Sequence, residues 1–139
     1  MAIDNVFSPN RLDASLIQTA ALPATAASTQ TTGINVDAGG KAHLPDHVEL
    51  KVSAPALATG ELGDTNTMTY TIEESDDNSS YNTLYGSVIV QTGASGAGAA
   101  AATQRVRLPS TVKKYVRLKA TADTALDASD KSMTLEVLT

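Results

Sequence analysis

The chain has 139 residues, a length that fits one domain with a single hydrophobic core. Its hydrophobic fraction of 42% includes 22 alanines, so the core must be thin and built mainly from Val, Leu and Ile. Cysteine is absent, which excludes disulfides and thiolate metal sites. No apolar run approaches the roughly 20 residues that span a bilayer, and Asp4 and Asp13 do not fit the basic start of a signal peptide. We therefore expect a protein that acts without secretion and without a membrane.

The formal net charge of -5 is unevenly distributed. Residues 1–100 contain 11 acidic and 3 basic residues, whereas residues 101–139 contain 4 acidic and 7 basic residues. The C-terminal third is thus a different electrostatic surface, which suits contact with an acidic partner or self-association of unlike surfaces. Scattered, solvated charges are the simpler interpretation of the same distribution.

Residues 1–33 are rich in Ala, Thr, Ser and Gln and contain few large side chains. Such a segment cannot bury enough area by itself to offset the entropy that ordering costs. We interpret it as an extended N-terminal arm that is either flexible or docked on something else, with Leu16 and Ile17 as an anchor in the form of a short edge strand. The folded domain is then predicted to cover residues 34–139.

The first clear strand pattern covers residues 48–52, where valine and leucine alternate with polar side chains, and Pro55 ends it. Residues 56–66 follow as a surface loop with two glycines.

Residues 67–90 form the centre of the predicted fold. Between 67 and 74, apolar residues alternate with threonine and glutamate, which is typical of a strand with one buried face. Six short polar residues, 75–80, then favour a turn. The second run, 84–90, is apolar on both parities, which predicts a strand that lies inside a sheet. Together these features predict a long antiparallel hairpin.

The run 93–102 has no side chain larger than Ser. Because each of its glycines costs a helix about 1 kcal/mol, we expect a mobile or a closely packed loop. Three more strands are predicted over 104–108, 115–121 and 132–138, each with alternate apolar residues facing inward. Seven or eight short strands without a helical pattern predict an all-β, single-domain antiparallel β-sandwich.

Few residues suggest chemistry. His43 and His47 have the spacing of a metal pair on a helix, but Pro45 between them excludes that helix, so we interpret them as loop histidines. The acidic residues of 73–77 are candidates for Ca²⁺ binding or acid-base catalysis, but they fall at a strand end and a turn without a twelve-residue calcium loop. We therefore expect neither an enzyme nor a bound cofactor.

Six basic residues between 105 and 119 form the one concentrated charge feature. Arg105 and Arg107 share the outward side of one predicted strand, and Arg117 and Lys119 share that of the next, so the four form a basic stripe if the two strands pair. Nucleic acid is a poor partner, because only 4% of the residues are aromatic and the chain is acidic overall. A protein partner or a solvated face fits better. The candidate partner-binding residues are therefore Arg105, Arg107, Arg117, Lys119, Leu16 and Ile17.

Three stretches stand together in a recognisable layout. They are the strand, turn and strand over residues 70–84, the tripeptide 107–109 (Arg-Leu-Pro), and residues 114–118 (Lys-Tyr-Val-Arg-Leu), preceded by the polar arm. In this layout the chain resembles the small capsid cement, or decoration, proteins of tailed bacteriophages, in particular the jelly-roll type known from a Bordetella podovirus. The loop over residues 94–102 has no counterpart in that pattern.

The resemblance implies a jelly-roll sandwich on the outside of an icosahedral shell of HK97-like major capsid protein. Such a protein is made in the cytoplasm of the host bacterium, forms homo-oligomers such as dimers or trimers at symmetry axes, and stabilises the virion by bridging capsid subunits. No catalytic residue carries over.

A second class of function remains open, namely a non-catalytic carbohydrate-binding or attachment module. Glycan sites usually present Trp or Tyr rings, and the chain offers only Tyr70, Tyr81, Tyr85 and Tyr115 near its predicted strands.

Overall fold

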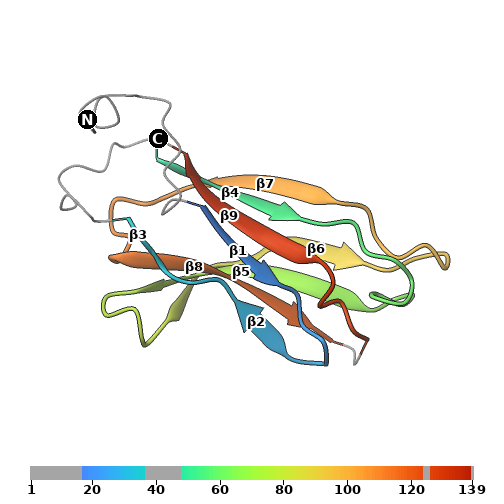
Figure 1. Cartoon of the computed structure of the whole chain (residues 1–139). Helices are drawn as coiled ribbons and strands as arrows, with labels where there is room; N and C mark the ends of the chain where they lie inside the picture. The colour runs from blue at the N-terminus through green and yellow to red at the C-terminus, as the bar shows by residue number, and fades with distance from the viewer. Residues whose placement is uncertain (1–16, 37–47, 124–125, 139) are drawn as a thin grey trace, which may run out of the picture.

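The computed structural model describes residues 17–36, 48–123 and 126–138. All regular secondary structure within these ranges is β-strand (Figure 1), which confirms the predicted all-β class. No helix in the described ranges is long and apolar enough to cross a lipid bilayer. The strands are β1 (Ile17–Ala21), β2 (Ser28–Gln30), β3 (Ile34–Asn35), β4 (Glu49–Ala54), β5 (Thr67–Ser75), β6 (Asn82–Thr92), β7 (Ala102–Arg107), β8 (Tyr115–Ala122) and β9 (Ser132–Leu138).

The strands pair in a nested order around the turn between β5 and β6. β5 pairs with β6, β4 with β7, β2 and β3 with β8, and β1 with β9, always antiparallel. Because β2 and β3 take the place of one interrupted strand, the chain is a long hairpin folded over itself, as in an eight-stranded jelly roll. Sheet A has the order β1-β9-β4-β7 and sheet B the order β2-β8-β5-β6, with β3 also on β8. The predicted jelly-roll-like sandwich is confirmed.

The central hairpin is present, but its second strand lies at an edge. β6 is the last strand of sheet B, and its Val90 is 49% exposed, so the prediction that it lies inside a sheet is wrong. Register shifts occur on both sides of Ile72, where it faces β6. At such a shift, the side chains that face the core change from one set of alternate residues to the other. Leu84, Tyr85 and Val88 therefore all pack partly against the core, although only one neighbouring strand covers β6.

The segment expected to be an arm contributes to both sheets. β1 is an edge strand of sheet A, as the anchor prediction at Ile17 implies, and β2 pairs with β8 in sheet B. Leu22, between them, is only 1% exposed. Residues 17–33 are therefore part of the sandwich and not an arm preceding it, because backbone pairing with distant strands orders them without large side chains. Leu16 and the rest of residues 1–16 lie outside the described residues.

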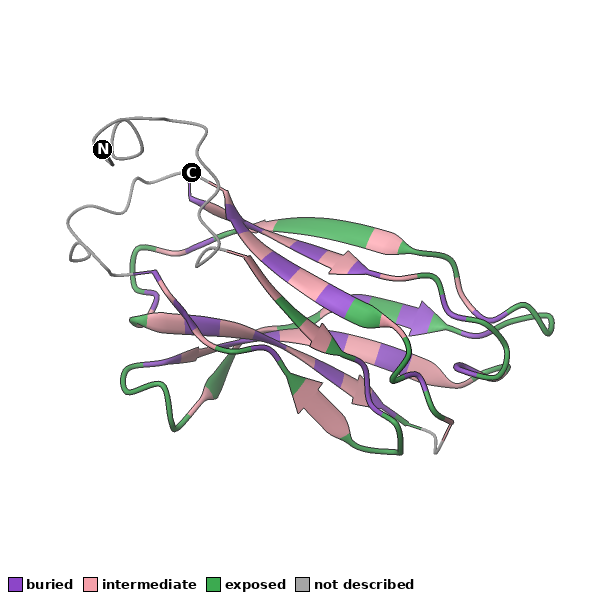
Figure 2. Ribbon diagram, viewed as in Figure 1, coloured by how far each residue is buried: buried purple, intermediate pink, exposed green. Residues whose placement is uncertain are grey.

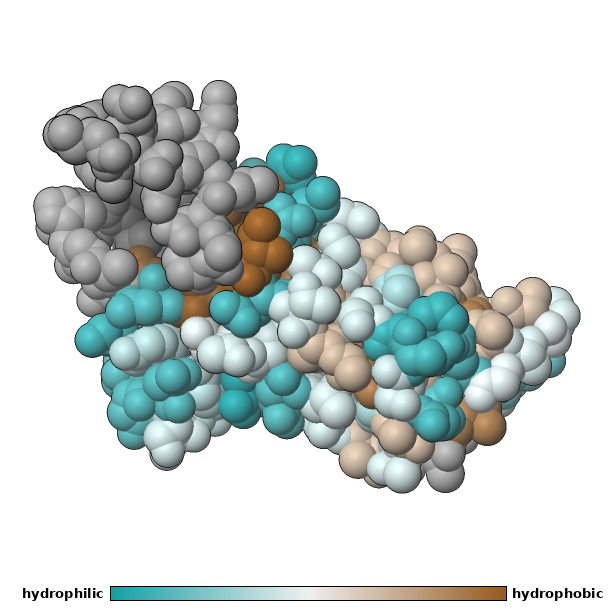
Figure 3. All heavy atoms as spheres, in the orientation of Figure 1, coloured by the Kyte–Doolittle hydropathy of each residue, from teal (hydrophilic) through white to brown (hydrophobic). Residues whose placement is uncertain are grey.

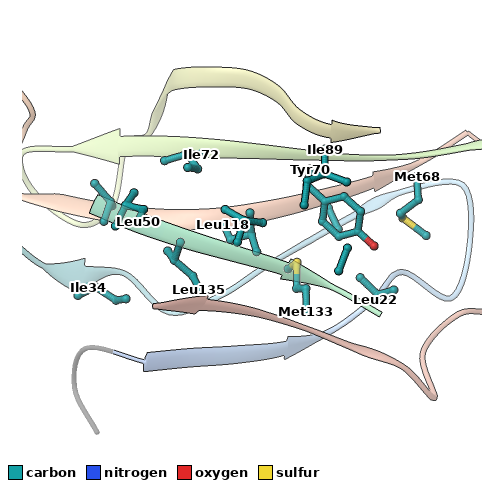
Figure 4. Close-up of a cluster of buried hydrophobic side chains, with 14 of the residues drawn as sticks. Leu22, Ile34, Leu50, Met68, Tyr70, Ile72, Ile89, Leu118, Met133 and Leu135 are labelled. Carbon is teal, nitrogen blue, oxygen red and sulfur yellow. The ribbon is translucent and has the colours of Figure 1, made fainter. Parts of the chain in front are cut away.

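The core lies between the sheets, and most of its strand residues are alternate residues of β4, β5, β8 and β9 (Figure 2). Tyr70 is fully buried within it (Figure 4), and its hydroxyl donates to Oε1 of Gln91 at 2.7 Å. Nε2 of Gln91 donates to the carbonyls of Pro55 and Ala100, so the buried polar groups are paired. Burial raises the pKa of Tyr70, which keeps its hydroxyl a donor. The predicted inward residues of β8 and β9 are confirmed as buried: Val116, Leu118, Ala120, Met133, Leu135 and Val137.

The loop after β6 packs tightly against the loop before β5. A Cβ at Gly98 would lie 1.9 Å from the carbonyl oxygen of Leu57, and one at Gly93 would lie 2.0 Å from that of Gly63. Leu57 and Ala99 also exchange backbone hydrogen bonds of 2.8 and 2.9 Å. Of the two predicted alternatives for the run 93–102, the structure therefore shows close packing at Gly93, Gly98 and Ala99, whereas residues 94–97 are exposed.

A carboxylate ties the loop before β5 to the turn before β9. Glu61, 7% exposed, accepts the N–H of Ala58 at 2.8 Å and the Nζ of Lys131 at 2.7 Å. The hydrogen bond from Ala58, followed by interactions with Asp130 and Lys131, lowers the pKa of Glu61 from its usual 4.5 to about 2. Ionised Glu61 therefore stabilises the folded chain.

We predict that Gly98→Ala destabilises the protein much more than Gly96→Ala. Both glycines have a positive φ, 67° at Gly98 and 66° at Gly96, so an L side chain costs about 1–2 kcal/mol at either position. Only at Gly98 does the new Cβ also meet backbone, whereas nothing lies within 4 Å of a Cβ at Gly96. Urea unfolding of both variants measures the difference, and equal losses would show that the loops do not pack closely.

We further predict an acid-dependent loss of stability that runs through Glu61. Because folding lowers the pKa of Glu61, the ionised carboxylate makes its full contribution to the free energy of unfolding above pH 4.5. This contribution disappears as the pH falls towards about 2. The free energy of unfolding of the wild type should therefore fall more steeply across this window than that of Glu61→Gln. Urea titrations at several pH values test this, and parallel curves for the two proteins would contradict it.

Candidate interaction face

The four basic residues predicted to form one stripe lie on opposite faces of the sandwich. Arg105 and Arg107 are on β7 of sheet A, which pairs with β4, whereas Arg117 and Lys119 are on β8 of sheet B. The two strands do not pair, so the conditional prediction of a single stripe is wrong. The reason is the nested topology, which sends these consecutive strands into different sheets.

Arg117 and Lys119 face a buried anion on the outer side of sheet B. Glu73, 6% exposed, lies opposite Arg117 and accepts its Nε at 2.8 Å. The Nζ of Lys119 is 3.6 Å from the other carboxylate oxygen of Glu73. Tyr81 covers the pair, since the guanidinium carbon of Arg117 is 3.8 Å from the centre of its ring. These two cations are thus engaged within the chain, and Arg117 also holds Tyr81, which follows the turn, against the sheet.

The acidic residues of the β5–β6 turn have structural partners as well. Asp77 Oδ1 accepts the N–H groups of Ser79 and Ser80, both at 2.9 Å. These bonds, the one from Ser80 first, lower the pKa of Asp77 to about 2. The carboxylate closes the predicted turn in the way short acidic side chains commonly do. Among the described residues there is no group of three or more potential metal ligands, and His43 and His47 lie outside them.

The outward side of sheet A brings the predicted residues Ile17, Arg105 and Arg107 onto one surface. Antiparallel register aligns residues of the four strands in rows across the sheet, and no described strand packs over them. One row consists of Ile17, Glu136, Lys51 and Arg105, and the next consists of Thr19, Thr134, Ser53 and Thr103. Glu49 and Arg107 lie opposite each other beyond the first row. We call the surface made by these ten residues the sheet A face.

The sheet A face carries a small cationic surplus in an acidic chain. Lys51, Arg105 and Arg107 are opposed there by Glu49 and Glu136. The closest ion pair, Arg105 to Glu49, is 3.8 Å long, and its side chains are 60% and 37% exposed. Such an exposed pair holds its partners only weakly, so these charges remain available to another surface.

Ile17 lies on the same face but at the opposite edge from Arg105 and Arg107, because β1 and β7 are the outer strands of sheet A. In the view of Figure 3, the surface of the molecule is mostly hydrophilic or neutral, and a hydrophobic patch adjoins the undescribed residues.

Sequence reasoning missed Glu49, Lys51 and Glu136 as members of the sheet A face. They could have been predicted, because they alternate with the inward residues that were recognised in the same strands and must therefore point outward.

The tyrosines do not provide an open stacking platform in the described part of the chain. Tyr70 is buried, Tyr81 is covered by Arg117, and Tyr85 donates its hydroxyl to the carbonyl of Arg107 at 2.7 Å. Tyr115 is half-buried, with the Nζ of Lys114 5.5 Å from the centre of its ring. Each ring is therefore at least partly engaged.

Comparisons with known proteins show the fold. No family model matches the chain, and no curated protein matches it. Among solved structures, it is similar to the PBSX exported protein XepA, with a TM-score of 0.52 and 19% identity over 86% of this chain. The chain spans about a third (34%) of XepA. At this identity the similarity establishes a shared β-sandwich fold and nothing about activity.

Two further solved structures are more distant. One is the CBM22-1 xylan-binding domain of Paenibacillus barcinonensis Xyn10C, with a TM-score of 0.43 and 14% identity, covering 94% of this chain and 98% of that domain. The other is from infectious bursal disease virus Gt strain, with a TM-score of 0.34 and 10% identity, covering 93% of this chain and 29% of the viral chain. Neither similarity is high enough to support an argument about function.

We predict that Glu73→Gln destabilises the protein by about 1–3 kcal/mol, because it leaves Arg117 and Lys119 beside a buried neutral group. The matched variant Glu49→Gln breaks only the exposed pair with Arg105 and should change the free energy of unfolding by less than about 1 kcal/mol. Urea unfolding at neutral pH compares them. A smaller loss for Glu73→Gln than for Glu49→Gln would show that the charge cluster on sheet B does not stabilise the fold.

Proposed function

We propose that this chain is a structural protein of a bacteriophage particle, which binds the outside of an icosahedral capsid and stabilises it by bridging capsid subunits. The observation that carries the proposal is the open sheet A face, which has Ile17 at one edge and Arg105 and Arg107 at the other and is not covered by any described strand. Its natural partner is a major capsid protein with an HK97-like fold, as the sequence resemblance implies. In this role the protein works by contact and needs no cofactor.

Three further features support this function. The sequence resembles phage cement proteins of the jelly-roll type, and the chain has the β-sandwich fold that this resemblance implies. The cationic surplus of the sheet A face reduces repulsion from an acidic surface, although the whole chain has a net charge of -5. A repeating lattice also engages one face of a sandwich many times, so that modest contacts add up.

The glycan-binding alternative has less support. Sugar recognition by stacking needs an accessible ring, and each tyrosine in the described residues is buried, covered or half-buried.

Residues 1–16, including Leu16, remain a second proposed contact with the shell. Their role is tested by deleting these residues alone, because a deletion to Gly33 also removes β1, β2 and the buried Leu22.

We predict that Arg105→Ala combined with Arg107→Ala weakens binding to capsid shells about tenfold or more, equivalent to about 1.4 kcal/mol. The test is co-sedimentation with shells of the phage that encodes the chain, prepared without this protein, over a range of salt. The wild type should saturate at a fixed ratio to the major capsid protein and bind less as salt rises.

The matched control is Lys113→Ala combined with Lys114→Ala, which removes the same charge outside the sheet A face. It should bind nearly as the wild type does. Equal losses in the two double variants would show that net charge alone, and not the sheet A face, governs binding. Absence of saturable binding by the wild type would overturn the capsid proposal.

A further inference from the structure

The described edge strands of the two sheets are β1, β2, β3, β6 and β7, and β6 differs from the other four. β3 has only two residues. β1 has five residues, β2 has three, and β7 carries Arg105 and Arg107. β6 has eleven residues and contains neither a charged residue nor a proline. Natural β-proteins usually protect their edges with short strands, charges, prolines or bulges. Of these devices β6 has only the irregularity near Ser87, whose φ is 53°.

Beyond that irregularity, β6 is a regular strand with a free side. Its last residues pair with β5 in constant register, from Ile89 opposite Tyr70 to Thr92 opposite Thr67. No described strand lies on the other side of β6 in sheet B. Val90 in this stretch is the one large hydrophobic side chain among the described residues that is classed as exposed, at 49%.

The backbone of Val90 points to this free side. Thr67 donates its N–H to Asp123 Oδ1 at 2.9 Å and accepts the N–H of Asp123 at 3.2 Å, so its backbone groups face away from β6. Hydrogen-bonding direction alternates along an antiparallel strand, so Thr69 also faces away from β6. Val90, which lies opposite Thr69, therefore directs its N–H and C=O away from β5 and towards the open edge.

We propose that two copies of this chain associate by pairing their β6 strands antiparallel, about a two-fold axis at Val90. In this register Val90 of each copy lies opposite Val90 of the other, and the two residues exchange backbone hydrogen bonds. Val88 lies opposite Thr92 of the partner. The exposed Val90 side chains then cover each other as a cross-strand β-branched pair.

The uncharged edge is the reason that the occupant is a second copy. A two-fold interface brings identical residues together, so any charge on the edge would face a like charge. Two chains of net charge -5 repel each other over most of their surface, and β6 is a long edge at which like residues meet without that cost. Valine and threonine also pair well with each other across strands.

This arrangement has a geometric consequence for the proposed capsid contact. A two-fold axis that relates adjacent antiparallel strands of one sheet runs perpendicular to that sheet, so both copies keep the same side outward. The two sheet A faces therefore point in the same direction, and one dimer presents two of them to the same surface. Bivalent attachment of this kind strengthens binding without new contacts. The dimer itself does not depend on the capsid proposal.

The oligomeric state of the purified full chain is the first test, measured by sedimentation equilibrium over a range of concentrations without shells. We expect the wild type to approach twice the chain mass as concentration rises and Val90→Lys to remain a monomer. The control Thr103→Lys places the same charge on the exposed β7 edge and should still dimerise. A monomeric wild type, a different stoichiometry, or a Val90→Lys variant that still dimerises would overturn the proposal.

Disulfide trapping tests the register independently, because the chain contains no cysteine. Paired residues that exchange hydrogen bonds have Cα atoms about 5.5 Å apart, within the range that a disulfide bridges. Val90→Cys should therefore form a covalent dimer under mild oxidation. Thr92→Cys should not, since the two substituted positions lie about 13 Å apart along the strands. Equal cross-linking of both variants would overturn the two-fold register at Val90.

Discussion

The pairing of β5 with β6 across the 75–80 turn is the constraint on which the rest of the sandwich depends. Asp77 closes this turn by accepting two backbone N–H groups, and Tyr81 and Arg117 hold it against sheet B. Each further pair, β4 with β7, β2 and β3 with β8, and β1 with β9, lies outside the previous one along the chain. The turn therefore sets the point about which the whole chain folds back.

Nesting also decides where charge resides. Strands that follow one another after the turn enter opposite sheets, so one run of basic residues is divided between two faces. On sheet B, Glu73 engages Arg117 and Lys119 and leaves them with a structural role. On sheet A, Arg105 forms an exposed pair with Glu49, and Arg107 lies on the same outward face, so both can contact another molecule. The same residue type thus has two uses within one short stretch of sequence.

The proposed functional surfaces are an open face and an open edge, at right angles to each other in the sandwich. The sheet A face suits attachment to a larger surface because it is polar and slightly cationic. The β6 edge suits pairing with another copy because the backbone groups of Val90 face away from β5, no described strand lies on that side in sheet B, and the side chains of β6 are uncharged. Together they allow a small chain without chemistry of its own to link neighbouring sites on a particle.

The sequence alone determined the regularly alternating strands and their buried sides, because side-chain alternation is a local property that follows from the two-residue period. It therefore predicted residues 48–52, 115–121 and 132–138 correctly, and the β5–β6 turn from its short polar residues. Neighbours in a sheet depend on contacts between distant residues, which alternation does not encode. Only the tertiary structure could therefore place β6 at an edge, recruit residues 17–33 into the sheets, separate Arg105 from Arg117 and assemble the sheet A face.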